Sequence, residues 1–276
     1  MAKQSDVELA IAMRAEVTDL SSVEHEGVRY YALPRRGLNR YDTSDSAADH
    51  VFSCFRPDLL HVEGTEMAYA RRLLSRWSGP KVVSLQGVIN GYRPYQFGRI
   101  ESGEWVDCKS PGLLFTGLAL WVNDRFRFRP RLAGERQTLA MASDILGRTL
   151  WDRAQASWLA PQANYHHCPR ILREPFYQYK WTAERCEPFS IFVGNGASAL
   201  KGAHFAVRAL PLLQRHFPKV KLYIAGRDPF RLSRLSAQRA IGYSRYLTTL
   251  IRSQGVEAAV SFTGQLDAQA MADRMR

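Results

Sequence analysis

The sequence predicts an α/β protein in which parallel strands alternate with helices. Three observations indicate this class. The clearest is one strand–loop–helix–strand unit between residues 189 and 226. Short apolar runs separated by helical segments also occur in the first half of the chain. Finally, 276 residues, of which 46% are hydrophobic, are enough for two domains with cores of their own.

The strand–loop–helix–strand unit begins with an apolar run at residues 191–193. A loop containing Gly194, Gly196 and Gly202 follows it. Apolar residues then recur at helical spacing from residue 205 to residue 217, and a second apolar run, 220–225, stops at Gly226. Because both strands run the same way, the helix between them predicts a right-handed crossover in a parallel sheet.

The loop in this unit is suited to an anionic ligand. Glycines allow the backbone to approach a ligand closely, and a helix start offers N–H groups and a positive dipole end. Lys201 adds a cation at the same place. A tight turn with a solvated lysine explains the pattern equally well. Neither the full dinucleotide fingerprint nor the Walker pattern is present.

Turn residues and apolar periodicity predict the elements that precede this unit. Pro57 should end the first helix, and Thr65 should cap the second. We expect strands at residues 7–13, 28–33, 59–62 and 81–85, and helices ending near residue 55, starting after Gly64 and spanning 132–143.

The chain is strongly basic, with a net charge of +12. This charge favours anionic partners such as nucleotide diphosphates or acidic lipids. Nucleic acid is not expected, because no binding-module signature accompanies the charge. The four cysteines include no Cys-x-x-Cys pair, which favours free thiols in a reducing compartment. Without a signal peptide or a run of about 20 apolar residues, the sequence predicts a cytoplasmic protein.

One segment suggests contact with the inner face of a membrane. Residues 111–122 are the most apolar of the chain, and four arginines interleaved with Phe126 and Phe128 follow them. Apolar residues beside basic and aromatic ones suit a peripheral membrane contact. A buried helix followed by a solvated basic loop explains the same pattern at least as well. A cluster of metal ligands is not expected; residues 166–168, His-His-Cys, fit a polar loop better.

The strand–loop–helix–strand unit resembles the start of the donor-binding domain of family-4 retaining glycosyltransferases. These enzymes have two Rossmann-like domains, the GT-B architecture. The matching residues are Phe192, Val193 and then Gly194, Asn195, Lys201 and Gly226. The resemblance implies that the last four bind the diphosphate of a nucleotide sugar, with no cofactor and no metal. Asn195 stands where many members of the family place an arginine.

A second resemblance to the same family lies in the first half of the chain. Pro57, Asp58 and His61 precede a segment formed by Glu63, Gly64, Thr65 and Glu66, and the strand at 81–85 leads to Gln86. The resemblance implies that residues 63–66 line the acceptor cleft and that Gln86 is catalytic, contacting the sugar or the reacting hydroxyl. For Gln86 the alternative is a strand-capping amide. For His61 we favour a core histidine.

Residues 147–154, Gly-Arg-Thr-Leu-Trp-Asp-Arg-Ala, also resemble a segment of this group. Thr149 is expected to cap a helix and Asp152 to lie near its positive end. Arg148 and Arg153 would then help to bind an anionic donor or acceptor. A local set of ion pairs with Asp152 or Glu174 is the slightly favoured alternative.

The resemblance implies two domains: residues 1–187 as an acceptor-side Rossmann-like domain and residues 188–276 as an incomplete donor domain. The family's Glu-x7-Glu motif and its N-terminal glycine-rich loop are missing, so we expect a chain truncated at both ends. The implied reaction transfers a sugar, with retention, from a nucleotide diphosphate sugar to a lipid-linked or saccharide acceptor in surface polysaccharide synthesis. The alternative is a non-catalytic remnant or helper subunit that binds anions, a membrane or a partner chain.

Overall fold

The computed structural model describes the whole chain except residues 1–5, 38–40, 106–117, 119–120, 232–241 and 276. The chain forms two compact units. The first contains Met1–Arg93 and Asp124–Arg170, and the second contains Pro94–Asn123 and Ile171–Arg276. The sequence did not indicate that a segment from the first half of the chain belongs to the second unit.

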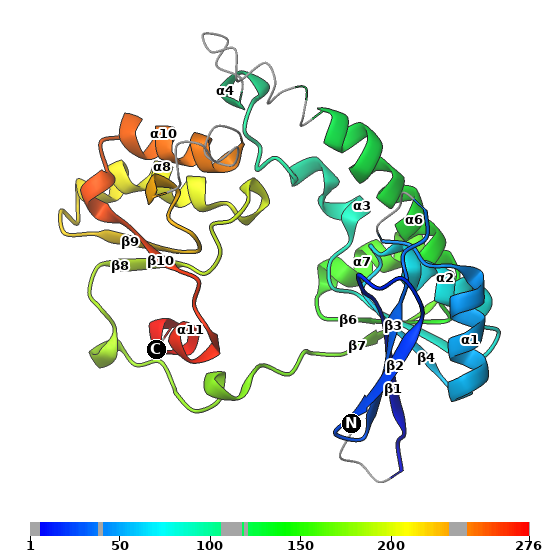
Figure 1. Ribbon diagram of the computed structural model, residues 1–276. Helices are drawn as coiled ribbons and strands as arrows, with labels where there is room; N and C mark the ends of the chain where they lie inside the picture. Colours follow the sequence, from blue (N-terminus) through cyan, green and yellow to red (C-terminus); the bar gives the residue numbers. More distant parts are fainter. Residues whose placement is uncertain (1–5, 38–40, 106–117, 119–120, 232–241, 276) are drawn as a thin grey trace. The chain divides into compact units, whose positions relative to one another are not determined.

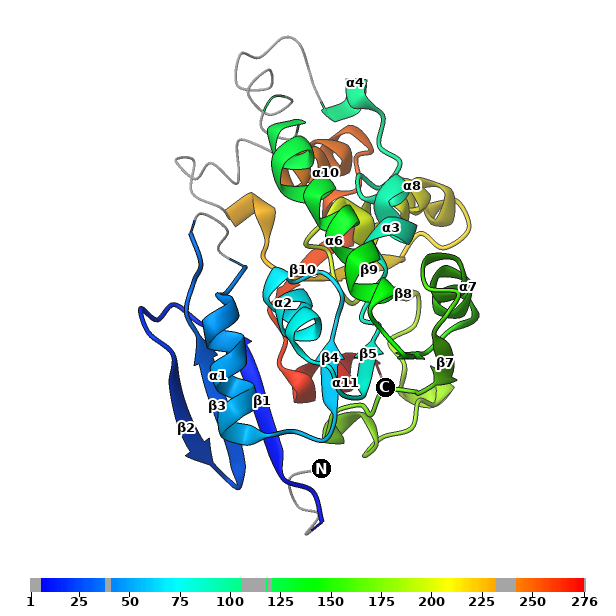
Figure 2. The ribbon, with the colours of Figure 1, turned by 90° about the vertical axis from the view of Figure 1, so that its right-hand side faces the viewer.

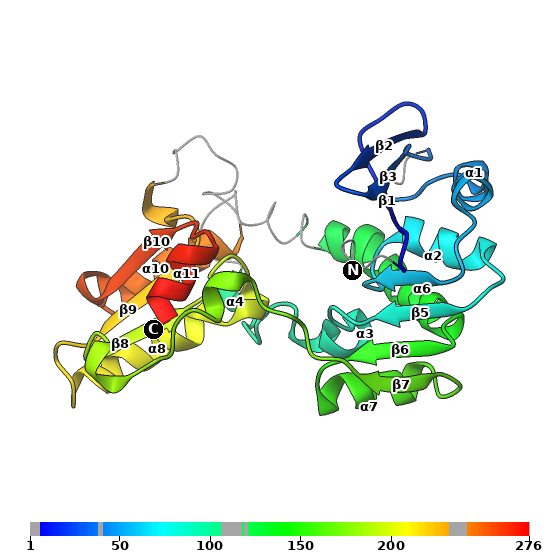
Figure 3. The same ribbon diagram turned by 90° about the horizontal axis from the view of Figure 1, so that it is seen from below.

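The first unit contains a sheet of four parallel strands in the order β4-β5-β6-β7, visible edge to edge in Figure 3. The strands are β4 (Leu60–Glu63), β5 (Lys81–Ser84), β6 (Asp144–Gly147) and β7 (Asn164–His167). β4 and β5 confirm the strands predicted at residues 59–62 and 81–85 in type and nearly in extent. β7 lies where we expected a polar loop. As an edge strand β7 is largely exposed, so it lacks the apolar pattern by which a strand can be predicted from sequence.

Helices connect these parallel strands and cover them. They are α2 (Ala68–Arg76), α3 (Ile89–Tyr92), α6 (Arg129–Ala140) and α7 (Leu150–Leu159). Leu74, Val83, Leu139 and Ile145 are almost fully buried between the helices and the sheet. The helix expected at residues 132–143 is therefore present but begins earlier, with Pro130 in its first turn, where a missing N–H costs nothing.

The N-terminal strands form a separate sheet. Its strands are β1 (Leu9–Arg14), β2 (Ser21–His25) and β3 (Val28–Leu33), in the order β1-β3-β2. β1 pairs with β3 in parallel, but β2 pairs with β3 in antiparallel fashion. Helix α1 (Asp45–Phe55) lies beside this sheet in Figure 2. The sequence analysis missed β2, because all five of its residues are exposed and carry no apolar alternation.

The second unit contains three parallel strands in the order β10-β9-β8. They are β8 (Ser190–Val193), β9 (Lys221–Ala225) and β10 (Val260–Gly264). Helices α8 (Ala203–Gln214) and α10 (Tyr243–Ser253) lie over one face of this sheet, and α11 (Ala268–Met275) lies over the other (Figure 1). The expected strand–loop–helix–strand unit is confirmed.

Short turns complete the described structure. A π-helical turn, η2 (Asp124–Phe128), leads into α6, and helix α4 (Ser102–Trp105) lies in the segment that joins the second unit. The 3-10 turns are η1 (Arg93–Tyr95), η3 (Glu174–Phe176), η4 (Ala183–Arg185), η5 (Ala199–Lys201), η6 (Pro229–Arg231) and η7 (Glu257–Ala259).

Polar contacts and packing hold residues 94–105, which follow η1's first residue, to the rest of the second unit. His204 is fully buried on α8, and its Nε2 lies 2.9 Å from the carbonyl oxygen of Gly98. Ile100 packs with Ala199 and Tyr246. These long-range contacts place this segment in the second unit, and no sequence pattern predicts them.

The α/β class with parallel sheets is confirmed, while two local predictions change. Thr65 does not cap a helix, because α2 starts at Ala68 and has no side-chain cap. The basic stretch after residue 122 is not simply solvated, because Asp124 accepts hydrogen bonds from both Arg93 and Arg129. Most of the apolar segment at 111–122 lies outside the described residues. The expected domain limit at residue 187 and the change of compact unit after Arg170 both fall between β7 and β8.

Candidate functional site

Polar side chains from four strands meet at one edge of the parallel sheet in the first unit. We call Glu63, Gln86, Arg148 and Arg170 the strand-end cluster, because they lie at or just after the ends of β4, β5, β6 and β7. The amide Nε2 of Gln86 lies 3.4 Å from Oε2 of Glu63, and a guanidinium nitrogen of Arg170 lies 2.9 Å from the same oxygen. Arg148 donates to the carbonyl oxygen of Gln86 at 2.8 Å.

This arrangement follows from the direction of the strands. Parallel strands place all their carboxyl ends at one edge, where ligands of α/β proteins commonly bind. Three members of the cluster, Glu63, Gln86 and Arg148, were predicted from the sequence. Arg170 was missed, since it follows the edge strand β7, which we had interpreted as a loop. The cluster offers one carboxylate, one amide and two guanidinium groups to a polar ligand.

His61 lies beside the cluster and is not a core histidine. Its side chain is 35% exposed, which corrects the sequence interpretation. Its Nε2 lies 2.6 Å from the hydroxyl of Ser84 and 3.4 Å from Oε1 of Glu63. His61 alternates with the buried Val62 along β4, so its side chain projects from the opposite face of the strand.

The residues after β4 form a tight turn rather than an open binding segment. Gly64 has a φ of +87°, and a Cβ there would lie 2.8 Å from a carboxylate oxygen of Glu66. That oxygen accepts the N–H of Thr65 at 2.8 Å. Thr65 is only 2% exposed. Of the predicted cleft residues 63–66, Glu63 therefore belongs to the cluster, while Gly64, Thr65 and Glu66 shape the turn that carries it.

A buried carboxylate on α6 fixes this turn, and the sequence analysis missed it. Glu135 is fully buried, and its carboxylate accepts four hydrogen bonds. The donors are the Thr65 hydroxyl at 2.5 Å, the Ile89 N–H at 2.9 Å, and the backbone and side-chain N–H groups of Asn90 at 2.7 and 2.8 Å. Glu135 thus ties together the loops that follow β4 and β5. Nothing in its sequence neighbourhood distinguishes it from a solvated helix glutamate.

The segment after β6 is organised as predicted. The hydroxyl of Thr149 accepts the N–H of Asp152 at 3.0 Å and caps α7. Asp152 is buried and accepts the N–H of Arg148 at 2.9 Å. Arg148 reaches the strand-end cluster, whereas Arg153 points from the exposed side of α7. Burial raises the pKa of the nearby Tyr165 phenol, and both arginines oppose that shift.

In the second unit, the predicted donor residues lie at the carboxyl edge of the sheet β10-β9-β8. Gly194 and Asn195 are exposed just after β8, and the Asn195 side chain accepts the N–H of Ala197 at 2.9 Å. Gly226, which follows β9, donates its N–H to the carbonyl oxygen of Gly264 at 2.9 Å and has a φ of +127°. A side chain at Gly226 would strain the backbone at this φ, whereas an added Cβ at Gly194 would meet only ordinary van der Waals contacts.

Lys201 is exposed at the end of η5, immediately before α8. The start of α8 is less open than expected, because the N–H of His204 donates to the hydroxyl of Tyr243 at 3.0 Å. The Tyr243 hydroxyl also lies 3.0 Å from Nδ1 of His204. Burial lowers the pKa of His204 and raises the pKa of Tyr243 to about 12. An anion near Lys201 would therefore find one N–H group at the start of α8, that of His204, already hydrogen-bonded to Tyr243.

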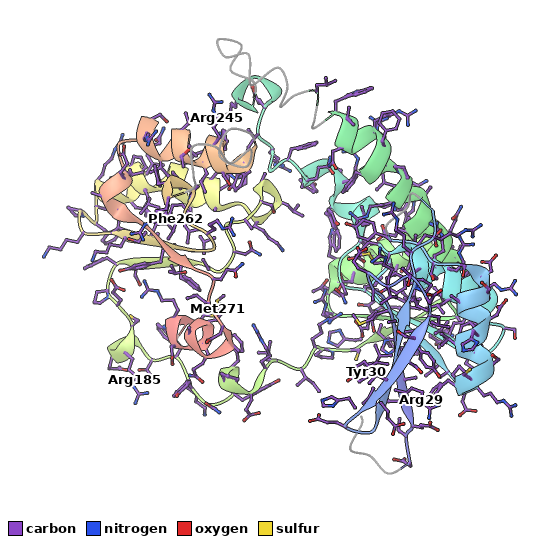
Figure 4. All side chains as sticks on the ribbon, viewed as in Figure 1. Arg29, Tyr30, Arg185, Arg245, Phe262 and Met271 are labelled. Atoms are coloured by element: carbon purple, nitrogen blue, oxygen red, sulfur yellow. The ribbon has the colours of Figure 1, made fainter. Side chains whose placement is uncertain are left out.

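The second unit also contains a hollow of about 460 Å³ that no sequence pattern predicted. Phe262 of β10, labelled in Figure 4, lies in its wall. Two charged residues that line the hollow form an ion pair, with a nitrogen of Arg231 3.3 Å from a carboxylate oxygen of Asp228. The guanidinium of Arg252 lies over the ring of Phe230. The hollow is lined by Asp228, Phe230, Arg231, Arg252, Glu257, Val260, Ser261 and Phe262, none of which was predicted as a site residue.

In the described part of the chain, no three His, Cys, Asp or Glu side chains gather closely enough to hold a metal ion. None of the described helices combines the length and the hydropathy needed to cross a bilayer.

Among solved structures, the chain is similar to a sucrose-phosphate synthase from Thermosynechococcus elongatus. The fold is the same. The TM-score is 0.56 at 16% sequence identity, and the match covers 96% of this chain and 62% of the synthase chain. The chain thus spans less than two thirds of the length of the structure that it matches. No protein-family model and no curated protein sequence matches it. At this identity the match shows an α/β fold of the GT-B type.

Proposed function

We propose that this chain, alone or as part of a longer protein, transfers a sugar from a nucleotide diphosphate sugar to an acceptor hydroxyl. The observation that carries the proposal is the strand-end cluster. Glu63, Gln86, Arg148 and Arg170 come from four separate strands and converge on one edge of a parallel sheet, in a chain whose fold matches that of a solved sucrose-phosphate synthase.

The strand-end cluster is suited to a hydroxyl-rich acceptor. A sugar presents several hydroxyl groups that both donate and accept hydrogen bonds, and the cluster offers acceptors and donors side by side. In this proposal the Glu63 carboxylate accepts from an acceptor hydroxyl, and the Gln86 amide contacts the reacting hydroxyl or the transferred sugar. Arg148 holds the Gln86 backbone in place through its 2.8 Å hydrogen bond.

The loop after β8 is the proposed donor site. The leaving nucleotide diphosphate carries negative charge, which the Lys201 ammonium and nearby backbone N–H groups would stabilise. Gly194 and Gly226 leave the strand ends open for a close approach of the diphosphate. Asn195 would contribute less than the arginine found there in many relatives, because its amide carries no charge and its Oδ1 already accepts a backbone N–H.

The test is turnover with a panel of nucleotide sugars and simple saccharide acceptors. We expect release of the nucleotide diphosphate above background. Lys201→Ala and Gln86→Ala should each reduce kcat/KM by roughly tenfold to a thousandfold, in the range found for lost transition-state contacts. Lys219→Ala is the matched control, since Lys219 is an exposed lysine in the turn between α8 and β9.

Two results would count against the proposal. One is turnover that Lys201→Ala and Gln86→Ala leave unchanged. The other is a full-length chain that binds nucleotide diphosphates through Lys201 but turns over no sugar with any acceptor. That second result would favour the binding-only alternative, a remnant or helper subunit.

A further inference from the structure

Helix α7 exposes an apolar face to solvent in the first unit. Leu150 is 84% exposed, Trp158 is 66% exposed and Trp151 is 42% exposed. Leu150, Ala154 and Trp158 are spaced four residues apart, so they form one stripe along the helix. We call Leu150, Trp151, Ala154 and Trp158 the α7 apolar face. Large apolar side chains gathered in this way mark an interaction surface more often than isolated ones do.

The exposed charged residues on helices α6 and α7 are all positive. Helices α6 and α7 each contain one acidic residue, Glu135 and Asp152, and both are buried. Their arginines are different: Arg129, Arg136 and Arg153 are exposed. Arg136 of α6 lies over the Trp158 ring, with its guanidinium carbon 5.6 Å from the ring centroid. The two helices therefore present indole, aliphatic and guanidinium groups with no exposed carboxylate of their own.

We propose that the α7 apolar face docks on a lipid surface with anionic headgroups. Tryptophan and leucine insert at the boundary between headgroups and acyl chains, and neighbouring arginines are attracted by anionic lipids. An aliphatic side chain as exposed as Leu150 has no favourable role against the phosphates of a nucleic acid. The positive charge of the arginines attracts anionic headgroups, and the apolar side chains of the α7 apolar face can insert among the acyl chains.

This inference is separate from the proposed transfer reaction, because it concerns a binding surface. The experiment needs no activity. The full chain is sedimented with vesicles of phosphatidylcholine, alone or mixed equally with phosphatidylglycerol, at about 0.1 M salt, where charges more than about 10 Å apart are largely screened. We expect binding to the mixed vesicles that is at least tenfold stronger than binding to phosphatidylcholine alone.

The variants separate insertion from general attraction. The double variant Leu150→Ser, Trp158→Ser should weaken binding to the mixed vesicles at least tenfold, since two apolar side chains lose their burial in lipid. Leu59→Ser and Trp181→Ser are the matched controls, because Leu59 is 54% exposed and Trp181 is 63% exposed elsewhere in the chain. Each control should change binding less than about twofold.

A second measurement keeps the test independent of the folding of the double variant. Brominated lipids should quench tryptophan fluorescence in the wild-type chain and quench it less in Trp158→Phe. The proposal is overturned if the chain does not bind mixed vesicles, if the controls lose as much binding as the double variant, or if quenching is unchanged in Trp158→Phe. Tighter binding to an RNA oligonucleotide, lost on Arg136→Glu but not on Leu150→Ser, would also overturn it.

Discussion

The hydroxyl of Thr65 donates a hydrogen bond of 2.5 Å to the carboxylate of Glu135, which lies 70 residues further along the chain. Both residues are almost completely buried. The same carboxylate accepts both backbone N–H groups at the start of α3. A single side chain on α6 thus holds the loops after β4 and β5, from which two members of the strand-end cluster project.

Replacing Glu135 with alanine should destabilise the first unit strongly. The change leaves the Thr65 hydroxyl and the N–H groups of Ile89 and Asn90 without their acceptor, and each buried unsatisfied donor costs about 1–3 kcal/mol. We expect the free energy of unfolding to fall by about 3 kcal/mol or more, measured by urea denaturation. Glu8→Ala, at an exposed glutamate of the same unit, is the control and should change it by less than about 0.5 kcal/mol. Equal effects of the two variants would contradict this role of Glu135.

Removing the cap of α7 should have a smaller effect. Thr149→Ala deletes the hydroxyl that accepts the N–H of Asp152, and loss of an N-cap costs about 1 kcal/mol. Thr149→Ser keeps the oxygen and should retain most of the stability. Thermal unfolding of the two variants distinguishes them, and a Thr149→Ser protein as unstable as Thr149→Ala would show that the methyl group, not the cap, matters.

Gly98 should not tolerate a side chain, whereas Gly103 in the same segment should. Gly98 has a φ of +64°, and a Cβ there would lie 2.6 Å from both the Ala199 carbonyl oxygen and the His204 ring. Gly103 has nothing within 4 Å of an added Cβ. Gly98→Ala should therefore loosen the segment from the second unit and lower its stability by about 2 kcal/mol or more, while Gly103→Ala should be close to neutral.

Limited proteolysis checks this prediction alongside thermal unfolding. We expect faster cleavage of Gly98→Ala within residues 94–105, because a segment released from its contacts exposes its backbone. Cleavage of Gly103→Ala should match the wild type. If Gly98→Ala were cleaved no faster, the contact between Gly98 and His204 would not be what fastens the segment.

The second unit should lose stability as the pH falls below about 6.5, because of His204. The Gly98 carbonyl accepts only, so Nε2 of His204 carries the proton and Nδ1 accepts from the Tyr243 hydroxyl. Burial lowers the pKa of His204 below its ordinary value of 6.5. Below pH 6.5 the unfolded chain therefore binds a proton that the folded chain resists, and the stability from the neutral imidazole declines until the lowered pKa is reached.

His204→Gln isolates this effect, since its amide can still donate to the Gly98 carbonyl but does not titrate. We expect the unfolding midpoint of the wild type to fall more between pH 7 and pH 5 than that of the variant, by thermal unfolding at each pH. Parallel pH profiles for the two proteins would show that other groups dominate the acid sensitivity.

The sequence by itself determined the α/β class and most of the parallel strands. Apolar runs such as those of β5 and β9 are buried or partly buried along most of their length, so the apolar residues themselves predict the strands. The helix cap was also predictable from the sequence. Thr149 caps α7 as predicted, because a cap depends on residues only a few positions apart. The glycines after β8 and β9 were also recognised, because each loop follows directly from a strand.

Only the tertiary structure decided which polar residues act together. The sequence around Thr65 is typical of a helix cap, but its hydroxyl donates a hydrogen bond to the buried carboxylate of Glu135 instead. Arg170 and the segment around Gly98 gain their roles through partners that are more than 100 residues away. The physical reason is that apolar periodicity reports which residues are buried, whereas a hydrogen bond between distant segments depends on where folding brings their side chains together.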